Sequence, residues 1–128
     1  MGMDLISKSG EAFDLSATWW WFYRALAELH GWKPIGTGKP EHLADNVRWD
    51  GMYDSCDGQI VKKEDAEALG HALTKAIANP NLSEVIDQVL FDPQNQLGET
   101  ADIMKAEFEL EFTLQLIEFC NFGEFQID

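Results

Sequence analysis

The longest patterned stretch of the chain is residues 101–120, and its apolar positions predict a helix. Wound at about 100° per residue, these positions fall on two nearly opposite faces: Ile103, Ala106, Leu110, Leu114 and Ile117 on one, and Met104, Phe108, Phe112, Leu116 and Phe119 on the other. Thr100 is a favourable N-cap, and Gly123 stands where a helix-ending glycine is expected. A helix with two apolar faces is normally covered on both sides, so we expect it to be the central helix of the fold.

A β-strand is the alternative for part of this stretch. Residues Phe108–Leu116, FELEFTLQL, alternate between apolar and polar side chains, which is the period of a half-buried strand. The length of the stretch, its terminal signals and its few β-branched residues favour the helix. Because of the alternation, a strand remains an alternative interpretation.

The rest of the chain alternates between short strand patterns and helix patterns. The expected strands are Met3–Ser7, Ala12–Leu15, Val47–Tyr53, Ile60–Val61 and Phe125–Ile127, and the other expected helices are Ala17–His30, Lys63–Ala78 and Leu82–Phe91. The first two strands form one hairpin, and a turn at Asp57-Gly58 makes a second hairpin from the next two. The sequence therefore predicts one α+β domain over residues 1–128, with three to four helices and the C-terminal helix central against a small antiparallel sheet.

Three consecutive tryptophans stand near the start of the first helix. Its expected core stripe is Trp19, Phe22, Leu26 and Leu29, which places Trp20 and Trp21 on the flank. Three adjacent residues cannot all point inward from one helix, so at least one tryptophan should be half exposed. Exposed aromatic side chains are enriched in binding patches, and Trp20 or Trp21 is the expected apolar anchor.

Composition is that of a folded protein in a reducing compartment. The chain has 128 residues, 45% of them hydrophobic, with five tryptophans, which is enough to bury a core. Cys56 and Cys120 form no CxxC pair and no disulfide framework. The sequence shows no charged-then-apolar leader and no apolar run of membrane-spanning length, so we expect a cytoplasmic protein.

The net charge of −14 is concentrated toward the C-terminus. Residues 79–128 hold 11 acidic side chains and a single base, Lys105, a balance of −10. Such a field repels nucleic acid and anionic membranes and attracts basic proteins. Solubility alone would also account for it.

Motifs for cofactors and metals are incomplete. Gly36-Thr37-Gly38-Lys39 resembles the end of a phosphate-binding loop, but Lys33 and Pro40 stand where that loop needs glycine and serine or threonine. A partial calcium-loop pattern around Gly58 has Tyr53 at its first ligand position. The three histidines are isolated in the sequence. We therefore expect no cofactor, no metal site and no catalytic residue.

Two sequence patterns carry a resemblance. The first runs Trp49-x-Gly51-x-Tyr53-x-Ser55-x-Asp57-Gly58-Gln59-x-Val61, and the second is Phe119-Cys120-x-x-Gly123-x-Phe125. Together they resemble a group of small uncharacterised bacterial proteins. The resemblance covers about a quarter of the chain, rests on turn and cap residues, and implies a bacterial cytoplasmic domain without implying an activity.

The leading functional hypothesis is a non-enzymatic acidic protein that binds a basic partner, such as an immunity protein or an inhibitor of a defence nuclease. Its carboxylates would stand in for phosphates on the basic surface of a nucleic-acid-binding enzyme, without direct contact to nucleic acid or membrane. The expected contact residues are Glu107, Glu109, Glu111, Glu118, Trp20 and Trp21.

The alternative is a small enzyme or ligand-binding protein. Its expected pocket is lined by Trp19, Trp49 and Tyr53, with Asp50, Asp54 and His42 as polar groups. The two hypotheses differ in shape, since the first needs a flat or convex acidic surface and the second a concave apolar cavity.

Overall fold

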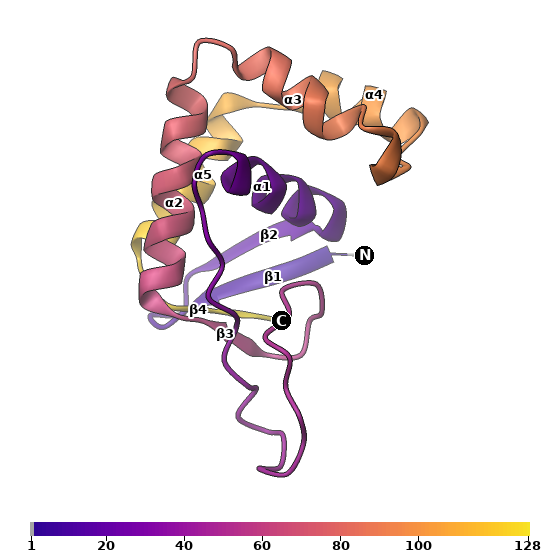
Figure 1. Ribbon diagram of the computed structural model, residues 1–128. Helices are drawn as coiled ribbons and strands as arrows, with labels where there is room; N and C mark the ends of the chain where they lie inside the picture. Colours follow the sequence, from indigo (N-terminus) through magenta and orange to yellow (C-terminus); the bar gives the residue numbers. More distant parts are fainter. Residues whose placement is uncertain (1) are drawn as a thin grey trace.

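The computed structural model describes residues 2–128 and joins their strands into one antiparallel sheet in the order β2-β1-β4-β3 (Figure 1). The strands are β1 (Gly2–Ser7), β2 (Ala12–Ser16), β3 (Gln59–Val61) and β4 (Phe125–Ile127). This confirms the predicted β1–β2 hairpin and the return of the chain as a C-terminal strand. The strand β4 pairs with both β1 and β3 and so joins the two halves of the sheet.

One face of the sheet is buried and the other faces solvent, as the alternation of side chains along a strand allows. Met3 pairs with Leu15, and Leu5 pairs with Phe13 on one side and Ile127 on the other. These side chains point toward the helices and are buried or half-buried. The opposite face carries the exposed side chains of Asp4 and Asp14, which are paired directly across β1 and β2.

We expect Asp4→Asn to raise the melting temperature at pH 7. A hydrogen bond with the Asp14 carboxyl, and then repulsion by its charge, raise the pKa of Asp4 above its ordinary value of 3.8. The folded chain therefore holds this proton more tightly than the unfolded chain. The stability linked to it is complete below pH 3.8 and is lost as the pH rises through the folded value. At neutral pH both carboxylates are charged and like charges lie opposite each other, which is destabilising.

Thermal unfolding of this variant between pH 3 and pH 7 checks the expectation. The gain in melting temperature over the unchanged protein should be largest at pH 7 and should vanish toward pH 3. Asp45→Asn, at an exposed position in the loop, is the matched control. Equal melting temperatures of D4N and the unchanged protein at pH 7 would show that the Asp4–Asp14 pair carries no repulsion.

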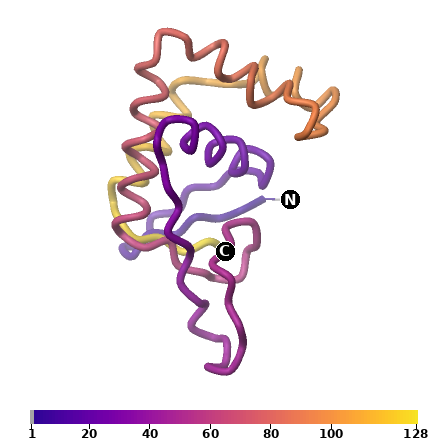
Figure 2. Tube along the Cα trace, in the orientation of Figure 1, coloured from indigo at the N-terminus to yellow at the C-terminus, as the bar shows by residue number. Residues whose placement is uncertain are grey.

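The helices lie on the buried side of the sheet, the first of them in contact with β1 and β2 and the third and fourth beyond it (Figure 1). They are α1 (Ala17–Leu29), α2 (Lys63–Ala78), α3 (Leu82–Leu90), α4 (Glu99–Glu107) and α5 (Leu110–Asn121), with a 3-10 turn η1 (Pro93–Asn95) between α3 and α4. The trace in Figure 2 shows the loop between α1 and β3 extending away from the sheet and helices. Within residues 2–128, the helices are all too short or too polar to cross a membrane.

The predicted C-terminal helix is interrupted. Phe108 and Glu109 adopt extended backbone angles and separate α4 from α5. No proline or glycine causes this break. It lets α4 pack on α3 while α5 packs on α2, and it places the Phe108 ring edge-on against Phe22, with 6.0 Å between ring centroids. Packing has therefore overridden the helix propensity of the sequence.

The predicted cover on both apolar faces of this helix is absent. Helices α2 and α3 each pack against three other helices, whereas α5 packs mainly on α2. On α4 and α5 the predicted second apolar face is uncovered, with Ile103, Leu110 and Leu114 exposed. The strand alternative fails as well, because only Phe108 and Glu109 of that stretch are extended.

The predicted strand Val47–Tyr53, with its hairpin to Ile60–Val61, is absent from the fold. Gly51 has φ of +74°, a left-handed conformation that interrupts an extended strand. Gly51 lies close to Gly36, and its carbonyl accepts a hydrogen bond from the Thr37 amide at 3.1 Å. Strand β3 pairs instead with β4, which the chain supplies more than 60 residues later.

The first helix begins as predicted, but its buried face is shifted. The Ser16 hydroxyl accepts a hydrogen bond from the Trp19 amide at 3.1 Å and caps α1. Trp20 is fully buried, whereas Trp19 and Trp21 are half-buried and Leu29 is exposed. The Trp20 indole donates to the Tyr53 carbonyl at 2.8 Å and packs on Phe125. Contacts with Phe125 of β4 and with Tyr53 in the loop before β3 therefore determine that Trp20 is the buried tryptophan.

Candidate functional site

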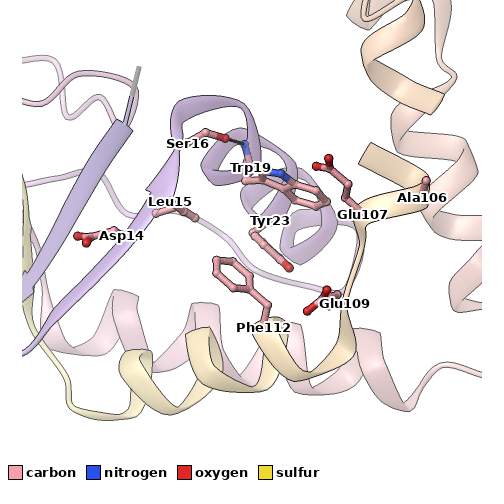
Figure 3. Close-up of a pocket in the computed structure, with 9 residues that line it drawn as sticks. All are labelled: Asp14, Leu15, Ser16, Trp19, Tyr23, Ala106, Glu107, Glu109 and Phe112. Atoms are coloured by element: carbon pink, nitrogen blue, oxygen red, sulfur yellow. Dashed lines mark hydrogen bonds between the residues drawn. The ribbon is translucent and has the colours of Figure 1, made fainter. Parts of the chain in front are cut away.

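A cavity of about 550 Å³ opens between the end of β2, helix α1 and the α4–α5 connection (Figure 3). This volume is in the range of small-molecule and side-chain binding sites. We call the cavity the α1–α5 groove. Its lining residues are Asp14, Leu15, Ser16, Trp19, Tyr23, Ala106, Glu107, Glu109 and Phe112.

Aromatic rings form the wall of the groove between α1 and α5. The spacing of Trp19 and Tyr23 places both on one side of α1, and their ring centroids lie 5.9 Å apart. Phe112 stacks on Tyr23 at 6.2 Å. The Tyr23 hydroxyl is held by Thr113 at 2.8 Å. Burial raises the pKa of Tyr23 to about 12, so the hydroxyl stays protonated at neutral pH and provides no general base.

Acidic side chains stand at the edge of these rings. Figure 3 shows Glu107 and Glu109 on the side of Trp19 that faces away from Leu15, and Asp14 beyond Leu15. Both glutamates are exposed. Glu107 is the last residue of α4, where the helix dipole disfavours a negative charge. A residue type that opposes local stability in this way is typical of a functional position.

A second surface lies on the solvent-facing side of α5. We call it the α5 outer face, and it consists of Leu110, Glu111, Leu114 and Glu118. Helical spacing places Leu110, Glu111 and Glu118 next to Leu114. Leu110 and Leu114 are 49% and 47% exposed. The surface therefore combines uncovered apolar side chains with carboxylates.

The four glutamates of these two surfaces have no counter-charge of their own. Among residues 2–128, none of Glu107, Glu109, Glu111 and Glu118 lies within ion-pair distance of a basic side chain. Lys105, the base nearest in sequence, pairs with Asp87. The carboxylates are therefore free to attract a cation from outside the chain.

The structure divides the predicted partner-binding residues. It brings Glu107 and Glu109 together at the groove and places Glu111 and Glu118 on the α5 outer face. Trp20 is buried in the core, so its prediction as an exposed anchor is wrong. Trp21 lies by a separate hollow of about 450 Å³, lined also by Gln94, Asn95 and Leu97.

The residues of the predicted alternative pocket do not come together. Trp19 lines the α1–α5 groove, but Trp49 donates its indole hydrogen to the Thr37 carbonyl at 3.2 Å, and the Tyr53 hydroxyl donates to Asp65. The polar groups are dispersed on the surface: Asp50 pairs with Arg48, Asp54 pairs with Arg24, and His42 is exposed. An aromatic cavity exists at Trp19, but its other rings are Tyr23 and Phe112.

Sequence reasoning missed Asp14, Tyr23 and Phe112 as groove residues. The four-residue spacing of Trp19 and Tyr23 was a usable signal, because it places two large aromatic rings on one helix face. Phe112 and Asp14 had no such signal. Their position depends on the break at Phe108–Glu109 and on where β2 meets α1.

Groups for nucleophilic or metal chemistry are not assembled at the groove. Burial raises the pKa of the Cys120 thiol to about 12, and burial together with the charge of Asp57 raises the pKa of exposed Cys56. Both thiols are therefore protonated at neutral pH. Within residues 2–128, no three metal-binding side chains of the His, Cys, Asp or Glu types gather closely enough to hold an ion.

Comparison of the chain with protein-family models, with curated proteins and with solved structures found no match.

Proposed function

We propose that this chain is a non-enzymatic binding protein that docks the α5 outer face on a basic protein surface. The observation that carries the proposal is the uncovered pair Leu110 and Leu114 beside the unpaired carboxylates of Glu111 and Glu118. The partner class that fits is an enzyme with a basic nucleic-acid channel. The chain would then act as an immunity protein or a nuclease inhibitor does, covering the channel with carboxylates in place of phosphates.

Apolar and charged groups have different tasks in such an interface. Leu110 and Leu114 supply surface that is removed from water on binding, which lowers the free energy of the complex and slows dissociation. Glu111 and Glu118 lie at the rim, where charge speeds association and selects partners. The net charge of −10 over residues 79–128 extends the negative electrostatic potential beyond these two side chains.

The charge favours a basic protein over other occupants of this face. A second copy would bring the same glutamates together, and like charges at an interface cost binding energy. Nucleic acid and anionic lipid surfaces are negative and would be repelled. A basic protein surface is the macromolecular partner that gains from all four carboxylates.

The double reversal Glu111→Lys with Glu118→Lys should weaken partner binding by about 100-fold or more. The test is affinity capture from a lysate of the source organism, at low salt and at about 0.5 M salt, where screening is strong. The unchanged chain should capture a basic protein that is released at high salt. Purified, this protein should lose nuclease activity when the unchanged chain is added and keep it with the reversed variant.

The matched control is the double reversal Glu28→Lys with Glu67→Lys. Both residues are exposed and lie on α1 and α2, so the net charge changes equally while the α5 outer face is intact. This control should retain binding apart from a modest loss in association rate. Equal loss in both double variants would mean that only net charge matters, and undiminished binding by the α5 variant would exclude this face as the interface.

A further inference from the structure

We propose that the α1–α5 groove receives an arginine side chain from the basic partner. This inference rests on the proposed function and adds a specific anchor to it. The α5 outer face gives the complex its general charge and apolar contact. The groove gives it a pocket for one particular side chain. The two surfaces are adjacent, because Glu109 of the groove directly precedes Leu110 of the α5 outer face.

The shape and lining of the groove suit a long side chain with an apolar stem. Half-buried Trp19 and Phe112 offer ring surface with fully buried Tyr23 behind them, and Leu15 and Ala106 complete the apolar lining. Trp19 is half-buried, so part of its ring remains open to a ligand. The methylene groups of arginine can lie along such a surface while the charged end stays near water.

The charge of the groove selects a cation. Glu107 and Glu109 supply its carboxylates, the Asp14 side chain points to the far face of the sheet, and none of its nine lining residues is basic. Glu107 and Glu109 approach the Trp19–Tyr23 ring pair from the α4–α5 connection (Figure 3). A guanidinium placed against Trp19 would therefore have ring surface on one side and carboxylates within reach on another.

The protein contains the same arrangement in its own fold. The guanidinium of Arg24 lies 5.4 Å from the ring centroid of Trp20 and 5.9 Å from that of Tyr53, and it pairs with Asp54. Aromatic rings and a carboxylate thus hold a guanidinium on a different face of α1 from the groove. The groove offers the same kinds of ring and carboxylate groups, but no basic side chain of residues 2–128 lines it.

Arginine fits these groups better than lysine does. Its guanidinium is planar and can stack on an indole ring, and it can donate two parallel hydrogen bonds to one carboxylate. An ammonium group is compact and strongly hydrated, and it gains less from a flat aromatic surface. The groove should therefore distinguish arginine from lysine, which simple charge attraction would not.

A titration of the isotope-labelled chain with capped tripeptides tests the groove directly. The probes are Gly-Arg-Gly, Gly-Lys-Gly and Gly-citrulline-Gly, and the signal is the indole N–H resonance of Trp19, assigned with the Trp19→Phe variant. The arginine peptide should shift this resonance in a saturable way, with affinity roughly tenfold above that of the lysine peptide. Citrulline keeps the shape without the charge and should not bind. Equal shifts with arginine and lysine, or no shift of Trp19, would overturn the proposal.

The second arm measures partner capture with Glu107→Gln and Glu109→Gln combined. Both side chains are exposed, so the variant should fold, and unchanged backbone spectra will show this. Binding to the captured partner should fall roughly tenfold or more. The neutralised control Glu28→Gln with Glu67→Gln should bind as the unchanged chain does.

The two arms separate failure of the groove from failure of the proposed function. Capture that is lost with the α5 lysine reversals but kept with Glu107→Gln and Glu109→Gln would retain the proposed function and overturn the groove. Arginine peptide binding without any protein capture would overturn the assignment of the groove to a partner side chain and leave a site for a free guanidinium compound.

Discussion

Replacing Trp20 with alanine should lower the free energy of unfolding by about 3–5 kcal/mol, the range for a large buried aromatic residue. Trp20 is 0% exposed and packs edge-on against Phe125 of β4. Its indole also donates to the Tyr53 carbonyl at 2.8 Å and lies under the Arg24 guanidinium. The change would leave a cavity where α1, β4 and the loop before β3 meet, and would remove one buried hydrogen bond.

Urea denaturation followed by circular dichroism measures this loss. Trp21→Ala is the matched control, because it removes the same side chain from the next position of α1, where the residue is half-buried. Its cost should be clearly smaller, about 1–2 kcal/mol from the area that it covers. If the two variants were equally destabilised, the buried face of α1 would not be the one that the structure shows.

Replacing Asp65 with alanine should cost about 3 kcal/mol, because two buried donors lose their acceptor. Asp65 is 1% exposed in the first turn of α2. One carboxylate oxygen accepts from the Trp32 indole at 3.0 Å, and the other accepts from the Tyr53 hydroxyl. These bonds attach both ends of the long loop to α2, so the variant should also loosen residues 33–58.

Two measurements test this expectation. Urea denaturation should show the loss of stability, and hydrogen exchange should show faster exchange in the loop than in β1 and β2. Asp50→Ala, which removes a carboxylate paired only with exposed Arg48, should change the stability by less than about 0.5 kcal/mol. Unchanged exchange in the loop of the Asp65 variant would mean that Asp65 does not hold it.

The hydrogen bond between Tyr53 and Asp65 also makes the stability of the fold depend on pH. Burial, and then the hydrogen bond with Asp65, raise the pKa of Tyr53 above its ordinary 10.0. The protonated hydroxyl therefore contributes stability that is complete below pH 10 and is lost as the pH rises through the folded value. Asp65→Ala removes one of these causes, so the alkaline loss of stability should be shallower in that variant.

Local signals in the sequence were sufficient for much of the fold. The β1–β2 hairpin, the Ser16 cap of α1 and the full extent of α2, Lys63–Ala78, are all as predicted. Each depends on residues near in sequence: a turn, a side-chain cap or a periodic apolar face. The α+β class followed from these elements.

The errors are at positions decided by residues distant in sequence. Phe108 and Glu109 have ordinary helix propensity, and the break there serves the separate packing of α4 on α3 and of α5 on α2. Trp20 is buried because β4 and the loop supply its contacts. No window of local sequence contains that information.

The candidate site was predictable in its chemistry but not in its assembly. The four glutamates follow directly from the charge of residues 79–128, and a half-exposed tryptophan was expected beside them. That this tryptophan is Trp19, and that it meets Glu107 and Glu109 in one groove, depends on the helix break. The apolar positions Leu110 and Leu114 were expected to be buried, and their exposure defines the α5 outer face.

The position of β4 between β1 and β3 has a consequence for the order of folding during synthesis. Ile127 pairs with Leu5 on one side and with Gln59 on the other, so it joins parts of the chain that are made far apart in time. The β1–β2 hairpin and α1 can form early from local contacts. Pairing of β4 with β1 is slower, because it must bring together the two ends of the chain. The apolar faces of the hairpin and α1 then stay open to water while residues 30–124 are translated. A chaperone that binds nascent chains would therefore meet this protein before its sheet is complete, and release would follow the pairing of β4.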